Sequence, residues 1–226
     1  MALPRVCTGL LAAVLVGAAM AQPANICRAG SGLPAAEELL FPREGLSLEA
    51  TLTQSGGTVI SLQELRSRKA LPQGAWKLYN NACKADRKGE YEVAEALTDD
   101  ALRDAPGFFE AHAGLAVLRL RQGAIESAEE QLVEALRIDP NYLPGRELLG
   151  IVTLLKGDAS SALKILKGVL ATDPGRAAAH YFMGRALCQL GQAQGAVKHF
   201  ETARELRRHP VQPQVDEEES ERFPID

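Results

Sequence analysis

Four glycines recur along the chain at intervals of 34 residues. They are Gly89, Gly123, Gly157 and Gly191, and each is followed five positions later by an alanine, at Ala94, Ala128, Ala162 and Ala196. A proline follows the first three glycines, at Pro106, Pro140 and Pro174, and a fourth arrives two residues late, at Pro210. Rows of residues that share one period predict an internal repeat. Aligned on the glycines, the units are residues 75–108, 109–142, 143–176 and 177–210.

Each unit contains two apolar runs with helical spacing on either side of its glycine. In the second unit the runs are Leu115, Val117 and Leu118, then Ala128, Leu132, Ala135 and Leu136. A glycine between two helices can take the left-handed conformation that ends a helix, and the residue before a proline disfavours continued helix. We therefore expect each unit to be a helical hairpin. A single hairpin cannot bury its apolar face, so the units must stack on one another.

The units resemble the tetratricopeptide repeat, a helix-turn-helix unit of this period. The matching residues of the last three units include Leu115-Ala116, Asp139-Pro140, Leu149-Gly150, Leu166, Asp173-Pro174, Met183-Gly184 and Phe200. The first unit departs most, at Asn81 and Thr98, and the early tryptophan of the family is replaced by Leu78, His112, Arg146 and His180. The resemblance implies an all-α fold, a right-handed superhelical solenoid of four helix-turn-helix repeats.

The N-terminus has the pattern of a secretory signal peptide. Residues 1–21 combine Arg5, an apolar run and the small-residue sequence Ala19-Met20-Ala21. The run is shorter than the roughly 20 apolar residues that span a bilayer, so a membrane anchor is the weaker interpretation, and we expect no stable membrane insertion after cleavage. By resemblance, a tetratricopeptide protein that is exported is expected to be of the bacterial type. The predicted location is therefore periplasmic or extracellular.

The charge and the two flanking segments add expectations about partners. A formal net charge of −4 gives no basic excess for nucleic-acid binding. Residues 211–226 are predicted to be an acidic, disordered tail, with a docking role for residues 223–225 left open. Residues 22–71 are predicted to be partly disordered, with a small β-hairpin over 46–62 and a short helix over 62–69.

No residue pattern points to catalysis, a cofactor or a metal site. His112 and His180 share one position of the repeat, which favours a packing role, and His199 and His209 have no cysteine or carboxylate at ligand spacing. The sequence contains no serine-nucleophile motif, phosphate loop or dinucleotide fingerprint. We expect a protein that is not an enzyme.

Three cysteines remain after signal cleavage: Cys27, Cys83 and Cys188. Cys83 and Cys188 belong to the first and last units, so they should be too far apart for a disulfide, which needs Cα atoms within about 7 Å. Cys27 lies outside the repeats and could reach Cys83. Free or intermolecular thiols are the alternatives, and thiol redox chemistry through Cys27 and Cys83 is the weakest of the functional classes considered.

The resemblance implies that the first helix of each unit lines a concave groove. The predicted groove residues are Tyr79, Cys83, Val117, Leu120, Arg121, Glu147, Ile151, Leu154, Leu155, Tyr181 and Arg185. The middle of this groove is apolar and its ends are polar and aromatic. The lysines, arginines and asparagines with which related domains hold acidic chaperone tails are almost absent. An apolar extended or helical segment is the expected ligand.

The function predicted from these features is a non-enzymatic scaffold that binds a protein or peptide in its groove, outside the cytoplasm. The alternative is an accessory subunit of an envelope complex whose N-terminal segment makes the main contact, with the groove filled by the chain itself. A third interpretation places Leu154 and Leu155 merely between helices. Self-association through the last repeat is a further hypothesis, because Val197 and Phe200 are expected to lie bare on its outer face.

Overall fold

The computed structural model describes Cys27 and residues 71–208. Within these residues the chain forms eight α-helices and no strand. The predicted signal peptide (1–21), hairpin (46–62), short helix (62–69) and acidic tail (211–226) lie outside the described residues. These four remain predictions.

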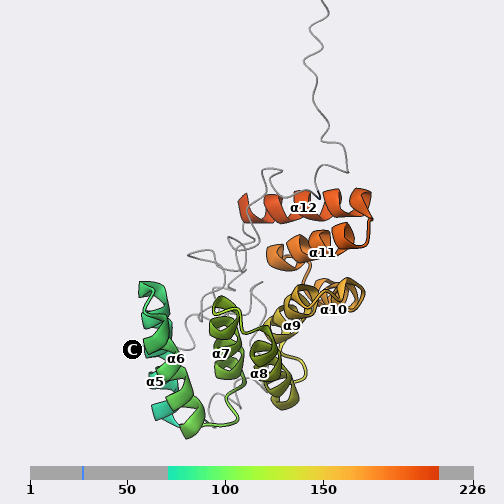
Figure 1. The fold of residues 1–226 in the computed structure, drawn as a ribbon. Helices are drawn as coiled ribbons and strands as arrows, with labels where there is room; N and C mark the ends of the chain where they lie inside the picture. The colour runs from blue at the N-terminus through green and yellow to red at the C-terminus, as the bar shows by residue number, and fades with distance from the viewer. Residues whose placement is uncertain (1–26, 28–70, 209–226) are drawn as a thin grey trace, which may run out of the picture.

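The helices follow one another as four hairpins, one in each repeat (Figure 1). Their bounds are α5 Gln73–Lys88, α6 Tyr91–Asp104, α7 Phe109–Arg121, α8 Ile125–Ile138, α9 Leu143–Leu155, α10 Ala159–Thr172, α11 Ala177–Gln189 and α12 Ala193–Arg208. The hairpins stack in sequence order into a curved array, with α5 and α6 at one end and α11 and α12 at the other. The all-α expectation is thus confirmed.

The four periodic glycines all adopt the left-handed conformation between the two helices of a hairpin. Their φ angles are +79° at Gly89, +75° at Gly123, +93° at Gly157 and +73° at Gly191. Only glycine takes such angles without steric cost. At the first of these turns the N–H of Glu90 donates to the carbonyl of Ala85 at 3.0 Å, a bond that satisfies one of the helix's last carbonyls.

Small residues on the first helix allow large residues on the second to pack inside each hairpin. A Cβ placed on Gly184 would lie 2.7 Å from Cε1 of Phe200, and one placed on Gly150 would lie 2.9 Å from Cδ2 of Leu166. Phe200 is therefore only 3% exposed, and the expectation that it lies bare on the outer face is wrong. Phe200 occupies the inward-facing position of the second helix. Of the two residues on which the hypothesis of self-association rested, only Val197 is partly exposed.

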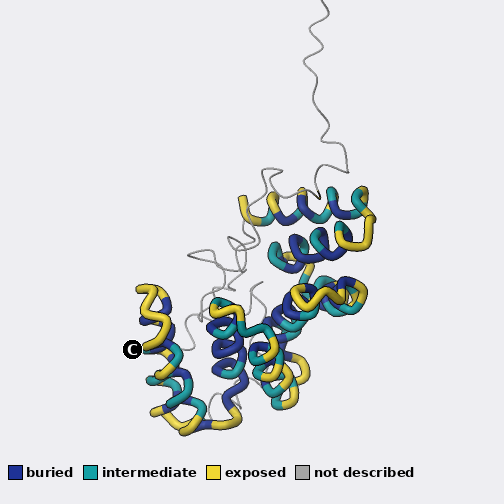
Figure 2. The backbone as a smooth tube through the Cα atoms, viewed as in Figure 1, coloured by how far each residue is buried: buried dark blue, intermediate teal, exposed yellow. Residues whose placement is uncertain are grey.

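First helices are buried on more sides than second helices (Figure 2). Ten of the thirteen residues of α7 are buried, whereas α8 buries three of fourteen. The same contrast holds between α9 and α10 and between α11 and α12. Second helices therefore bury a single stripe, as expected for helices with one face in solvent.

Within residues 71–208, no helix combines the length and the hydropathy needed to cross a bilayer.

Candidate functional site

All the predicted groove residues lie on first helices, at four equivalent positions of the repeat. Numbered from the start of each unit these are positions 5, 9, 12 and 13, on α5, α7, α9 and α11. Leu155 is exposed, Arg121 and Arg185 are half-buried, and the others are buried. The structure thus places the predicted residues on one face of successive helices, and most of them are not open to solvent.

The apolar middle of this face belongs to the hydrophobic core of the later repeats. Val117, Leu120, Ile151 and Leu154 lie in one buried cluster that extends from α7 to α12. Leu154 therefore fits the interpretation that it lies between helices. Leu155 does not, because 36% of its surface is exposed. It is the one predicted apolar groove residue that a partner could contact directly.

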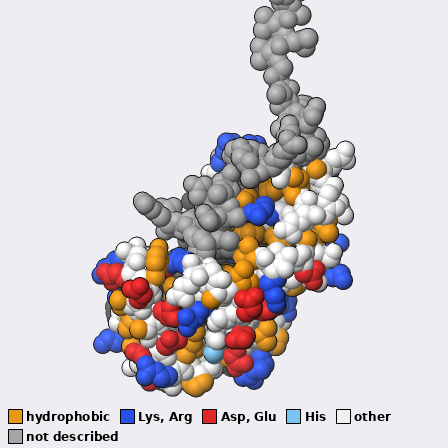
Figure 3. Space-filling view, in the orientation of Figure 1, with side chains coloured by type: hydrophobic (Ala, Val, Ile, Leu, Met, Phe, Trp, Pro, Cys, Tyr) orange, Lys and Arg blue, Asp and Glu red, His pale blue; other side chains and the backbone are white. Residues whose placement is uncertain are grey.

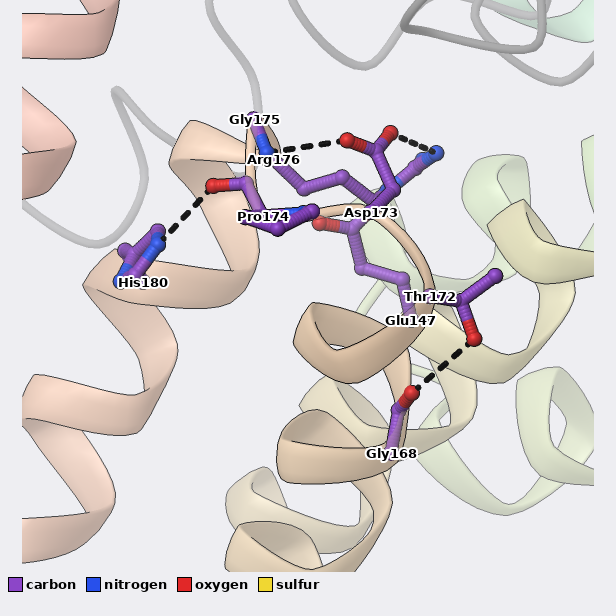
Figure 4. A network of polar contacts seen from close by, with 8 residues as sticks. All are labelled: Glu147, Gly168, Thr172, Asp173, Pro174, Gly175, Arg176 and His180. Carbon is purple, nitrogen blue, oxygen red and sulfur yellow. Dashed lines mark hydrogen bonds and ion pairs between the residues drawn. The ribbon is translucent and has the colours of Figure 1, made fainter. Parts of the chain in front are cut away.

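Glu147, predicted as a groove ligand, is held in a buried ion pair (Figure 4). Nε and Nη2 of Arg176 donate to Oε2 of Glu147 at 2.8 and 2.6 Å. The Asp173 carboxylate lies 3.8 Å from Nη1 of the same arginine and also accepts the N–H of Gly175 at 2.9 Å. Because the arginine neutralises it, Glu147 does not present a lone negative charge to a ligand.

The repeat alignment contains a partial signal for this ion pair. Arg176 is the last residue of the third unit, where the first two units have Phe108 and Tyr142, and all three are buried. A buried arginine requires an anionic partner. Two carboxylates of the same unit are candidates, Glu147 and Asp173, and the structure places both beside the arginine. Sequence reasoning treated each helix alone and so missed the pair.

Arg121 is also engaged within the array. Its guanidinium forms an ion pair with Asp86 of α5 and lies over the ring of Tyr91, 4.7 Å from the ring centroid. Asp86 is 5% exposed, so the pair joins the first two repeats in a partly dehydrated setting. Two charged residues of the predicted groove, Arg121 and Glu147, are thus used to hold elements of the array together.

The position where the family has an early tryptophan carries a hydrogen-bond donor in three repeats. Nε2 of His112 donates to the carbonyl of Pro106 at 3.0 Å, and Nε2 of His180 donates to that of Pro174 at 3.1 Å. In the third repeat Nε of Arg146 donates in the same way to the preceding proline carbonyl, at 2.8 Å. The two periodic histidines therefore connect the second and the fourth hairpin to the turn that precedes each of them.

His180 also meets a second histidine. Its Nδ1 lies 3.0 Å from Nδ1 of His199 on α12. Because Nε2 of His180 carries the proton donated to Pro174, its Nδ1 accepts from His199 when both rings are neutral. Burial, and after it the charge of His180, lower the pKa of His199 below its usual value. The contact therefore favours the neutral ring of His199.

Cys27 pairs with Cys188, not with Cys83. The Cα atoms of Cys27 and Cys188 are 5.3 Å apart in the disulfide. The predicted partner, Cys83, lies in the first repeat, whereas the bonded cysteine, Cys188, lies in the last. Cys83 is buried in α5 and takes no part in this bond. Since the segment that follows Cys27 is long enough to reach any repeat, sequence alone could not choose between them.

Cys188 occupies position 12 of its repeat, the position of Leu120 and Leu154 in the two preceding repeats. The disulfide therefore attaches the N-terminal segment to the groove side of the last hairpin. Among the described residues there is no group of three or more His, Cys, Asp or Glu side chains arranged to hold a metal ion.

Acidic and basic side chains alternate over the described part of the face shown in Figure 3, and apolar side chains lie between them. A nucleic-acid interface concentrates positive charge on one face. The face in view has no such concentration.

The model of the tetratricopeptide repeat family matches residues 87–149 and 154–214, more than half of the chain. The chain belongs to the tetratricopeptide repeat family. No curated protein matches the sequence.

Solved structures of this family show the same right-handed superhelical solenoid. The crystal structure of MamA is 21% identical, with a TM-score of 0.52 over 64% of this chain and 84% of that one. A MamA structure from Desulfovibrio magneticus RS-1 gives 22% identity and a TM-score of 0.54, over 62% of this chain and 78% of that one.

TTC0263, a thermophilic tetratricopeptide repeat protein of Thermus thermophilus, is 25% identical. Its TM-score is 0.54, over 60% of this chain and 76% of that one. Tetratricopeptide arrays are scaffolds for protein–protein interaction and are typically not enzymes, so the fold implies a protein partner.

Proposed function

We propose that this protein is an exported tetratricopeptide scaffold that binds an apolar protein segment along the concave face of its four repeats. The observation that carries the proposal is that the predicted groove residues share one face of successive first helices, on which Leu155 is 36% exposed. A binding surface that crosses several repeats can recognise an extended ligand at several points at once.

The charges beside this surface support an apolar ligand over a charged one. Glu147 is paired with Arg176, and Arg121 with Asp86, within the array. A charged ligand would have to displace one partner of each pair and leave the other uncompensated, at a large cost for buried groups. An apolar ligand leaves both pairs intact and covers Leu155, which is exposed on α9.

The proposal of export is supported by the disulfide between Cys27 and Cys188. Disulfides persist in oxidising compartments and are rare in the cytosol. Sequencing the N-terminus of the protein recovered from a periplasmic or culture fraction tests this directly. A mature chain that starts at Gln22 is expected, whereas a cytosolic chain that retains residues 1–21 would contradict export.

A pair of matched substitutions tests the binding face. Leu155 on α9 and Val133 on α8 are both exposed, at 36% and 54%, but they belong to a first and a second helix. We expect Leu155→Arg to weaken binding of the partner at least tenfold and Val133→Arg to leave it unchanged. Circular dichroism should show that both variants keep the wild-type fold.

The partner for this test is a protein that the wild-type array retains from an envelope extract and that quantitative mass spectrometry detects. Its affinity for each purified variant is then measured by calorimetry. Equal loss in the two variants, or loss in Val133→Arg alone, would show that the first helices do not form the binding face.

A further inference from the structure

We propose that residues 28–70 of this same chain occupy the concave face of the array, anchored at one end by the Cys27–Cys188 disulfide. This occupancy does not depend on whether a second protein also binds there. It follows from where the two ends of the segment are attached, from the burial of the first helices and from the composition of the segment.

The two ends of the segment are attached at opposite ends of the array. Cys27 is bonded to Cys188 of α11 in the last repeat, and Leu71 leads directly into α5 in the first repeat. These helices stand at the two ends of the curve in Figure 1. Whatever its conformation, the chain from 28 to 70 has to run from the last repeat back to the first.

The length of the segment permits a path along the groove. Six helix-to-helix steps of 8–10 Å separate α5 from α11, so with the length of one helix added the path is less than about 80 Å. Residues 28–70, if fully extended, reach about 140 Å. The segment can therefore cross the whole array and still contain compact stretches.

The position of the anchor selects the concave face. Cys188 occupies position 12 of its repeat, in line with Leu154, Leu120 and Asp86 on the preceding first helices. A chain that leaves this point towards α5 starts on the groove side. To reach the convex side it would have to pass around an edge of the array and over the second helices.

Burial of the first helices supports a cover on this side. Residues of α7 are buried around nearly the whole helix, including Ala111 and Leu118 on the side of the first repeat and Val117 and Leu120 in the later cluster. Neighbouring helices account for the sides of α7 towards α5, α6, α8 and α9. Any further side of α7 that is buried has to be covered by another part of the protein.

The composition of residues 28–70 suits such a site. The segment carries five acidic and five basic residues and therefore no net charge. It contains eight leucines together with Phe41, Val59 and Ile60. A neutral, leucine-rich chain can cover an apolar surface without disturbing the ion pairs at Glu147 and Arg121. A partner that uses the groove therefore competes with this segment for the same surface.

Photocross-linking in the full-length mature protein tests the proposal. A benzophenone amino acid replaces either Leu155 on the groove side or Val133 on a second helix, both exposed in the structure. Irradiated protein is digested and cross-linked peptides are identified by mass spectrometry. We expect position 155 to cross-link to residues 28–70 at a yield at least fivefold higher than position 133 does.

Mixing isotopically labelled and unlabelled protein before irradiation distinguishes links within one chain from links between two. Links within the chain support the proposal. Links only between chains, links from both positions at equal yield, or no link to residues 28–70 from position 155 would each overturn it. In the double variant Cys27→Ser with Cys188→Ser we expect the yield to fall at least threefold, and an unchanged yield would refute the anchoring role of the disulfide.

This outcome is separable from the test of function. If the intramolecular link forms but Leu155→Arg leaves partner binding unchanged, the groove is occupied and the partner binds elsewhere. If Leu155→Arg abolishes binding but no link forms to residues 28–70, the groove binds the partner and the proposed occupancy is wrong.

Discussion

The first repeat and the last two repeats place different chemistry at the same positions. At positions 5 and 34 the first repeat has Tyr79 and Phe108, whose ring centroids are 5.1 Å apart, whereas the third has the ion pair of Glu147 and Arg176. Both pairs are buried and both connect a first helix to the residue that enters the next repeat. The backbone of the repeat thus accepts either an aromatic or a charged connection.

A second pair of positions shows the same division. Positions 4 and 23 hold Leu78 and Leu97 in the first repeat and His180 and His199 in the last. At these two pairs of positions the first repeat uses apolar contacts that carry no charge. The last two repeats use ionisable groups there, so the stability of these contacts depends on charge state. This difference should be visible in mutational and pH measurements.

The largest loss of stability is expected when one partner of the Glu147–Arg176 ion pair is removed. Arg176→Ala leaves the buried carboxylate of Glu147 without its cation, and we expect a loss of about 3–5 kcal/mol in the free energy of unfolding. Urea denaturation followed by circular dichroism measures this. Arg137→Ala, which breaks only a surface pair with Glu134, is the control and should leave the transition unchanged. Equal effects of the two substitutions would contradict the buried-pair argument.

Replacing the charged connection by an apolar one should restore it by other means. The double variant Glu147→Met with Arg176→Phe removes both charges together, and replacing a buried ion pair by apolar groups is commonly neutral or stabilising by about 1–4 kcal/mol. Tyrosine is not copied from Tyr79, because its ring packs on Gly114, whereas the equivalent residue of the last repeat is Phe182.

At position 176, phenylalanine fits better than the tyrosine of the second repeat. An alanine, Ala179, stands three residues after Arg176, as Ala111 stands three residues after Phe108.

By contrast, Tyr142 packs on Gly145, where a Cβ would lie 2.6 Å from its ring. We therefore expect the double variant to unfold at a urea concentration no lower than wild type. If it were less stable than Arg176→Ala, the two kinds of connection would not be interchangeable.

An intermediate effect is expected at the close approach within the last hairpin. The first repeat pairs Ala82 with Thr98, whereas the last pairs Gly184 with Phe200. In Gly184→Ala the added Cβ meets the Phe200 ring, and overpacking of about 1–3 kcal/mol outweighs a gain of about 1 kcal/mol in helix propensity.

Thermal denaturation should show a lower midpoint for Gly184→Ala. Adding Phe200→Leu to this variant copies Ala116 and Leu132 of the second repeat and should recover most of the loss. A midpoint unchanged by Gly184→Ala, or a double variant no more stable than the single one, would show that the ring does not limit this contact.

The smallest effect is expected at the histidine pair and depends on pH. The pKa of His199 is lowered in the folded protein, so the unfolded chain binds its proton more readily. Stability is therefore fullest above the unfolded value of about 6.5 and falls as pH decreases from there towards the folded value. His199→Gln copies the His112–Gln131 pair of the second repeat, where Nδ1 and Oε1 are 2.8 Å apart.

We expect the variant to lose less stability between pH 8 and pH 5 than wild type. Hydrogen exchange measured at both pH values should place the wild-type difference in α11 and α12 and leave α5 and α6 unaffected. Equal pH dependence in wild type and variant would remove His199 as its source.

Most of the fold could be predicted from the spacing of a few residue types. Glycine at 34-residue intervals indicates a left-handed residue between helices, and the proline row limits the second helix, so the hairpins and their order follow from local constraints. Phe200 was misplaced because its position was judged by hydrophobicity on an end helix. The small residue opposite it, Gly184, is the signal for an inward-facing ring.

The candidate site could be predicted only in part. The repeat identifies which residues share a face, and Leu155 is exposed there as expected of a groove residue. It does not identify which charges are already paired. Glu147 and Arg121 were assigned to a ligand, but each has its partner on another element of the array, and such pairs depend on how the hairpins pack.

By itself the sequence determined the repeat, its helices and its turns, because these depend on backbone preferences that act within a few residues. Only the tertiary structure decided that Cys27 bonds to Cys188 across 161 residues of sequence, and that Glu147 and Arg121 are neutralised by Arg176 and Asp86. Contacts between residues far apart in a chain depend on how many helices stack and how the stack curves. No local pattern in this sequence specifies those quantities.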